Sequence, residues 1–94
     1  MNNIVDEIIK FRDERGWKHH DKPENLAKSI IIEAAELLEN YQWGPEGADL
    51  ENVKEEIADV IIYSIAMAHD LGFDLNEMIR EKLIKNAIKY PVKK

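Results

Sequence analysis

The segment 57–68, IADVIIYSIAMA, carries a single charged side chain, Asp59, in an otherwise apolar run. It belongs to a longer stretch with helical spacing of apolar residues, from roughly Asp49 to Leu71, and Gly72 follows in a position favoured for a C-cap. A helix that is apolar nearly all round is buried, and an isolated ionised carboxylate is too costly to bury alone. The sequence therefore predicts a long buried helix in which Asp59 is paired, protonated or bound to a metal.

Three other stretches share the helical spacing, and none shows the sustained alternation of a strand. They run from about Asn3 to Arg15, from Leu26 to about Tyr41 after Pro23, and from Asp74 until Pro91. Turn signals separate them, including the polar link that holds His19 and His20. The predicted fold class is all-α, with four helices in one domain over residues 1–94.

Composition limits the function classes. The 94 residues are 45% hydrophobic and 34% charged, which is typical of one soluble domain, and so small a domain often recruits a partner subunit. The chain has no cysteine, which excludes thiol chemistry and suits the cytoplasm. A net charge of −6 disfavours a nucleic-acid polymer as partner, and no apolar run approaches the ~20 residues of a membrane span.

Two pairs of carboxylates stand three residues apart: Glu33 with Glu36, and Glu56 with Asp59. Residues at this spacing share a helix face, and the first pair lies beside the apolar arc of its own helix. If the two helices face each other, four carboxylates meet, and they need a strong positive charge between them at neutral pH. Hard oxygen ligands of this kind select magnesium, calcium or manganese.

Two simpler interpretations remain open from the residues alone. Glu33 and Glu36 could be a solvated surface pair, since this spacing is common by chance. Asp59 could instead be the buried partner of a basic side chain: Arg12, Lys28 or Arg80.

The motifs favour phosphate chemistry with a magnesium-type ion. Di-iron bundles need a histidine three residues after a glutamate, and none of the three histidines stands there. An all-carboxylate site that leaves room for water and substrate is what phosphoryl or nucleotidyl transfer requires. A stripe on the last helix could face the phosphates or be a solvated basic face: Lys82, Asn86, Lys89 and Tyr90.

Four pieces of the chain, taken in order, resemble the MazG-like all-α nucleoside triphosphate pyrophosphohydrolases, close to their dCTP-pyrophosphatase-like members. They are FRDERGW, KPENLAKSIIIEAAELLENYQW, EEIADVIIYSIAMA and KLIKNAIKYP. The family signature is a Glu–x–x–Glu on one helix and a Glu–x–x–Asp on the next, and this sequence matches it at the two carboxylate pairs.

The resemblance implies Mg²⁺, with Mn²⁺ as a possible substitute, held by Glu33, Glu36, Glu56 and Asp59. It implies hydrolysis of a nucleoside triphosphate to the monophosphate and pyrophosphate, in nucleotide-pool house-cleaning. It also implies that the stripe on the last helix contacts the triphosphate. The implied base-enclosing residues are Trp17, Trp43, Phe11 and Asn25, although both tryptophans could instead be core anchors of an oligomer.

The resemblance further implies a homodimer or homotetramer built as a helical bundle, and the triplet Ile30–Ile32 agrees because it makes its helix apolar on more than one side. The chain departs from the family pattern at Ile32, often a glutamate, and at Asp21, often a histidine; the second departure bears on base selection. Alternative functions are a phosphoribosyl-ATP pyrophosphohydrolase and a non-catalytic helical oligomer that binds nucleotides or a protein partner.

Overall fold

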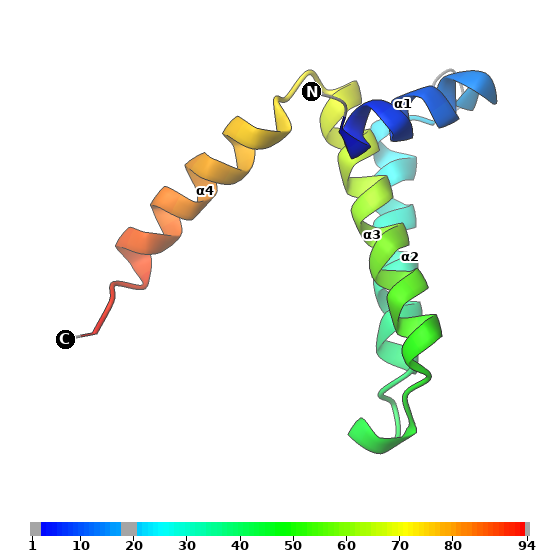
Figure 1. The fold of residues 1–94 in the computed structure, drawn as a ribbon, viewed down its shortest axis with the longest axis vertical. Coiled ribbons are helices and arrows are strands. Elements are labelled where there is room, and N and C mark those ends of the chain that lie inside the picture. The colour runs from blue at the N-terminus through cyan, green and yellow to red at the C-terminus, as the bar shows by residue number, and fades with distance from the viewer. Residues whose placement is uncertain (1–2, 18–20, 94) are drawn as a thin grey trace.

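The computed structural model describes residues 3–17 and 21–93. Within these ranges the chain forms four α-helices and the short 3₁₀ helix η2, with no strand, which confirms the predicted all-α class. The elements are α1 (Ile4–Glu14), α2 (Pro23–Glu39), η2 (Pro45–Gly47), α3 (Leu50–Asp70) and α4 (Leu75–Lys89) (Figure 1). His19 and His20 of the predicted link lie outside the described residues.

Side-chain caps explain where three of the helices begin. Asn3, Asp49 and Asp74 each accept a backbone N–H from the first turn of the helix that follows, which satisfies donors that have no partner inside the helix. Helix α2 begins at Pro23, three residues before the apolar pattern, because a proline is tolerated at the first helical position. The helices predicted from apolar spacing and turn signals therefore begin within a few residues of the observed boundaries.

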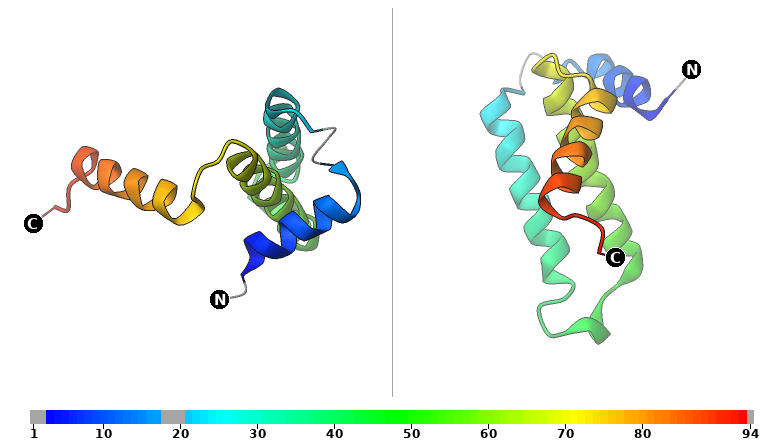
Figure 2. Two further views of the ribbon diagram at one scale, coloured as in Figure 1. Left: turned by 90° about the horizontal axis from the view of Figure 1, so that it is seen from above. Right: turned by 90° about the vertical axis from the view of Figure 1, so that its left-hand side faces the viewer.

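Helices α2 and α3 run side by side in opposite directions, and α1 crosses them near the end of α3 (Figures 1 and 2). The buried apolar residues lie where the three helices meet: Ile8, Leu26, Ile65, Ala66 and Ala68. This core is small, and most of it lies at one end of the hairpin.

The chain turns sharply between α3 and α4, at an elbow that includes Gly72 and Phe73. Gly72 has φ +81, a conformation that glycine adopts without strain, and Phe73 donates its N–H to the Ala68 carbonyl at 2.9 Å to close α3. Beyond the elbow α4 points away from α2 and α3 (Figure 1). Large apolar side chains on α4 are consequently exposed: Ile79, Leu83, Ile84 and Ile88.

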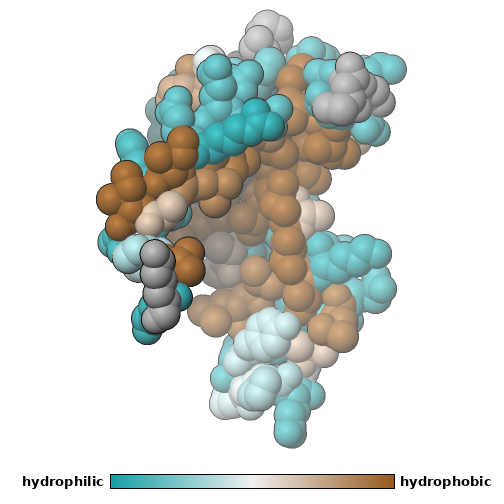
Figure 3. Space-filling model, turned by 60° about the vertical axis from the view of Figure 1, so that its left-hand side comes forward, coloured by the Kyte–Doolittle hydropathy of each residue, from teal (hydrophilic) through white to brown (hydrophobic). Residues whose placement is uncertain are grey.

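The isolated chain is more open than a folded monomer of its mass. Its accessible surface is 7805 Å², against about 5,600 Å² expected for a compact monomer of 10.9 kDa. Its radius of gyration is 16.0 Å, against about 12 Å expected. On the face of the molecule that Figure 3 draws, broad apolar areas surround a hollow. Among the described residues, no helix is both long and apolar enough to cross a membrane.

Candidate active site

Three carboxylates converge between α2 and α3. Glu33 comes from α2, while Glu56 and Asp59 come from consecutive turns of α3, and one oxygen of each lies within 4.8 Å of the others. Glu56 is buried and the other two are half-buried. The antiparallel pairing of the two helices brings together residues that the sequence separates by more than 20 positions.

Glu36, the fourth predicted member, is exposed one turn further along α2. It lines a shallow polar pocket together with Glu56 and the pair Asn40 and Asn52, in which the Asn40 side-chain N–H donates to Asn52 Oδ1 at 2.8 Å. Glu36 is therefore at the rim of the cluster, where hydrogen bonding to it helps to raise the pKa of Glu33 and of Glu56.

The electrostatics of the cluster are those of carboxylates without a counter-charge. Burial, followed by hydrogen bonding to the protonated form and repulsion from Glu36 and Glu33, raises the pKa of Glu56 to about 7. The pKa of Glu33 is raised too, first by a proton shared with Glu36 and then by burial. Among the described residues, the buried Oε2 of Glu33 has no hydrogen-bond partner.

This donor set fits a hard divalent cation. Magnesium, calcium and manganese take carboxylate oxygens, and an ion between the three groups would engage the unpartnered oxygen of Glu33 and relieve the mutual repulsion. A zinc or copper site would ordinarily include histidine or cysteine, and the cluster has neither.

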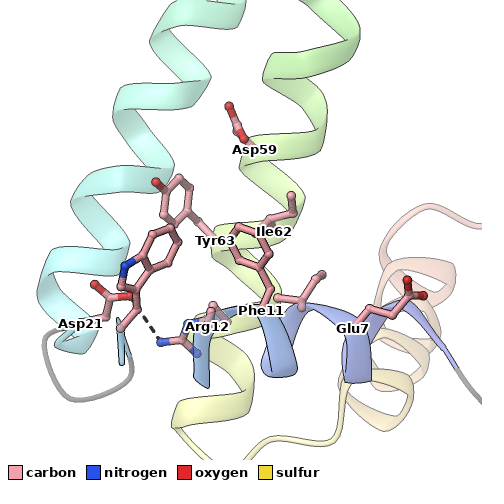
Figure 4. A pocket seen from close by; sticks show the side chains of 10 residues that line it. Glu7, Phe11, Arg12, Asp21, Asp59, Ile62 and Tyr63 are labelled. Atoms are coloured by element: carbon pink, nitrogen blue, oxygen red, sulfur yellow. Dashed lines mark ion pairs between the residues drawn. The ribbon is translucent and has the colours of Figure 1, made fainter. Parts of the chain in front are cut away.

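A pocket of ≈ 410 Å³ opens beside the cluster, between α1 and α3 (Figure 4). Its lining is mostly apolar and aromatic, with acidic groups at its edges: Glu7, Ile8, Phe11, Arg12, Trp17, Asp21, Asp59, Ile62, Tyr63 and Ala66. Phe11 and Trp17 meet edge to face, with ring centroids 5.5 Å apart. Flat aromatic walls next to a metal-binding carboxylate suit a molecule with both a ring and a charged group.

The opposite edge of the pocket is organised by Arg12, which is buried. Its guanidinium makes two parallel hydrogen bonds to Asp70, of 3.0 and 2.8 Å, and an ion pair of 3.5 Å with Asp21. Arg12 is thus engaged with these two acids, at the end of the pocket away from Asp59 (Figure 4).

Two of the four residues expected to enclose the base line the pocket, and the other two do not. Phe11 and Trp17 line the pocket, whereas Asn25 is exposed on the first turn of α2 and Trp43 is 91% exposed in the turn after α2. Neither of the latter two is among the described lining residues of the pocket.

The predicted phosphate contacts lie apart from the cluster in this chain. Helix α4 carries all four, Lys82, Asn86, Lys89 and Tyr90, with the last at its C-cap. Because α4 extends away from α2 and α3, a single chain does not bring these residues to the carboxylates (Figure 1).

Sequence reasoning did not single out Tyr63, and it did not identify Asp70 as the partner of Arg12. Tyr63 stands four residues after Asp59, so helical spacing alone places it on the same face. Asp70 had no such signal, because its partner Arg12 is 58 residues away.

Fold and site together define an all-α protein with a carboxylate cluster on two antiparallel helices and an aromatic pocket next to it. Within this class, the chain belongs to the MazG-like family, whose family model matches residues 28–94.

The proteins that are similar in sequence or structure are named as pyrophosphatases. The chain is 33% identical over 92 residues to dCTP pyrophosphatase 1 of Mus musculus, covering 88% of this chain and 54% of that protein. It is 33% identical over 91 residues to the Homo sapiens protein of the same name, covering 87% and 54%. The chain therefore matches about half the length of these relatives. A solved structure of a pyrophosphatase from Archaeoglobus fulgidus superposes with a TM-score of 0.80 at 41% identity, over 95% of this chain and 90% of that one.

Proposed function

We propose that this protein is a nucleoside triphosphate pyrophosphohydrolase. It hydrolyses the bond between the α and β phosphates of a ribo- or deoxyribonucleoside triphosphate and releases the monophosphate and pyrophosphate. Such an enzyme serves nucleotide-pool house-cleaning, and the absence of cysteine suits the reducing cytoplasm. The names of the similar proteins support this class of reaction.

One observation carries the proposal: a cluster of three carboxylates, including a buried oxygen that has no hydrogen-bond partner within residues 3–17 and 21–93, shares Asp59 with an aromatic pocket. The cluster suits an ion that holds phosphates, and the pocket suits a base. A nucleotide has these two parts next to each other.

We assign the metal as Mg²⁺, with Mn²⁺ able to replace it, and Glu33, Glu56 and Asp59 as the residues that hold it, with Glu36 at the rim. When bound, the ion would neutralise phosphate oxygens and make water a stronger nucleophile near neutral pH. Glu36 is exposed and lines the same shallow pocket as Glu56, so it can orient the attacking water or accept its proton.

The same proposal includes a homodimer or homotetramer. The excess surface of the single chain and the apolar side chains of α4 support a second copy packed against α4. Helix α4 is apolar on more than one side, as a helix enclosed between others is. In such an assembly, the stripe of Lys82, Asn86, Lys89 and Tyr90 would meet the phosphates at the cluster of another copy.

Two alternatives use the same scaffold. A phosphoribosyl-ATP pyrophosphohydrolase would hydrolyse the same bond in a different nucleotide. A non-catalytic oligomer would bind a nucleotide or a protein partner, and its carboxylates would only bind a structural metal ion.

The test is pyrophosphate release from a panel of ribo- and deoxyribonucleoside triphosphates, with magnesium and then with excess chelator. We expect release that the chelator abolishes. If no pyrophosphate is released from the panel but phosphoribosyl-ATP is hydrolysed, the first alternative is favoured. A metal-dependent rise in melting temperature without any release would favour the second.

A further inference from the structure

A hydrogen bond between two side-chain amides joins α2 and α3 close to the turn that connects them. Asn40, at the C-cap of α2, donates its Nδ2–H to Oδ1 of Asn52 in the first turn of α3, over 2.8 Å. Both residues are half-buried. The two amides are neutral, so this bond holds at any pH and with or without a metal ion.

The amide pair lies one helical turn from a carboxylate on each helix. Asn40 follows Glu36 by four residues on α2, and Asn52 precedes Glu56 by four residues on α3, so each amide shares a helix face with an acid. All four residues line the same shallow polar pocket. Because a helix is stiff over one turn, a shift of either helix at the amide pair also shifts the neighbouring carboxylate.

Other forces fix the register of the two helices only weakly at this end. The buried apolar residues lie toward the opposite end of the hairpin, where α1 crosses it (Figure 1). Near the amide pair, Leu38 and Leu50 are 68% and 73% exposed in the single chain. The carboxylates of the cluster repel one another when ionised, so they do not hold the helices together without a cation. A directional bond between two asparagines, in contrast, is satisfied at one register.

We propose that the pair Asn40–Asn52 positions the metal ligands. It fixes the register at which Glu33 on α2 faces Glu56 and Asp59 on α3. This inference rests on the proposed function, because it concerns the metal site assigned there. A site whose ligands stand at the correct spacing before the ion arrives binds the ion more tightly than one that must first be assembled. Neither asparagine touches the ion; both act through the helices that carry the ligands.

Binding of Mn²⁺ alone, followed by the electron paramagnetic resonance signal of the free ion, tests this inference. Asn52→Leu removes the acceptor of the bond at nearly constant side-chain size. We expect its dissociation constant for Mn²⁺ to rise by about tenfold or more, as it does when other groups that position metal ligands are lost. Asn76→Leu, the same substitution at an exposed asparagine of α4, should bind Mn²⁺ as wild type does.

The double variant Asn40→Leu/Asn52→Leu separates positioning from stability. Two leucines can pack against each other, so its melting temperature should return to that of wild type or exceed it. Apolar contact is not directional and does not set the register, so Mn²⁺ binding should stay weak. If the amide pair only stabilised the fold, the affinity for Mn²⁺ would recover together with the melting temperature, and the inference would be wrong.

Pyrophosphate release distinguishes a failure of this inference from a failure of the proposed function. If wild type binds Mn²⁺ but hydrolyses no triphosphate, the proposed function fails, while the Mn²⁺ affinities of the variants still decide the role of the amide pair. In an active enzyme, Asn52→Leu should need more Mn²⁺ for half-maximal release, with kcat at saturating Mn²⁺ close to that of wild type. An unchanged dissociation constant in Asn52→Leu, or no binding of Mn²⁺ by wild type, overturns the inference.

Discussion

Arg12 on α1 and Asp70 at the end of α3 form a buried two-pronged ion pair, with contacts of 3.0 and 2.8 Å between residues 58 positions apart. The two side chains are only 5% and 11% exposed. This pair holds α1 in its position across α2 and α3, near the end of α3 (Figures 1 and 2). Helix α1 forms one wall of the pocket there. The integrity of the pocket thus depends on an interaction at some distance from the carboxylate cluster.

Replacing one partner of this pair should destabilise the protein strongly. Asp70→Ala removes both oxygens that accept from the buried Arg12 and leaves it, among the contacts described here, the longer one to Asp21, and removing one partner of a buried pair costs about 3–5 kcal/mol. The free energy of unfolding, measured in urea at one protein concentration, checks this. Lys10→Ala is the matched control, because Lys10 is an exposed cation on the same helix, so we expect a loss below about 1 kcal/mol. Equal losses for the two variants would contradict the role given to the Arg12–Asp70 pair.

The metal-free protein should become less stable as pH rises. The pKa of Glu56 is about 7 in the folded chain against its ordinary 4.5, so the folded state binds more protons between these values. This contribution is fully present below pH about 4.5 and is lost as pH rises through about 7. Glu33 has a raised pKa and acts in the same direction.

Melting temperature in chelator from pH 5 to pH 8 measures this effect. It should fall across the window in wild type and less steeply in Glu56→Gln. Glu55→Gln, at the exposed neighbour, should behave as wild type. Adding magnesium at pH 8 should raise the melting temperature, because the ion binds the ionised carboxylates of the folded chain. A melting temperature that rises with pH in chelator would contradict this account of the cluster.

The apolar surface of α4 should hold the oligomer together. Ile88 is 78% exposed in the single chain, so Ile88→Glu should cost little within one protomer. If a second copy covers it, a buried unpaired carboxylate would instead disfavour assembly. Light scattering should then report a smaller species than wild type, whereas Lys10→Glu, at an exposed site on α1, should keep the wild-type mass. An unchanged mass for Ile88→Glu would show that α4 is not in the interface.

Local patterns predicted most of the fold. Helical spacing and turn signals predicted the helices to within a few residues, because these signals, like the side-chain caps that the structure has at Asn3, Asp49 and Asp74, act inside one turn. The convergence of Glu33, Glu56 and Asp59 also followed from spacing, once two neighbouring helices presented carboxylates on their facing sides.

Long-range contacts were beyond sequence reasoning. Nothing near Arg12 in the chain indicates Asp70 as its partner, since the pairing depends on how α1 crosses α3. The position of α4 likewise depends on what packs against it, because its apolar residues are spread around the helix and do not form one stripe.

The most direct test of the central claim is magnesium-dependent pyrophosphate release by wild type and Asp59→Asn, with Glu55→Gln as the matched control. Asp59 belongs to both the carboxylate cluster and the pocket, so its loss should remove metal and substrate positioning together. We expect release by wild type and Glu55→Gln and a fall of about 100-fold or more in Asp59→Asn, with helicity by circular dichroism unchanged. Substantial release by a folded Asp59→Asn protein would contradict the assignment of the carboxylate cluster as the catalytic metal site.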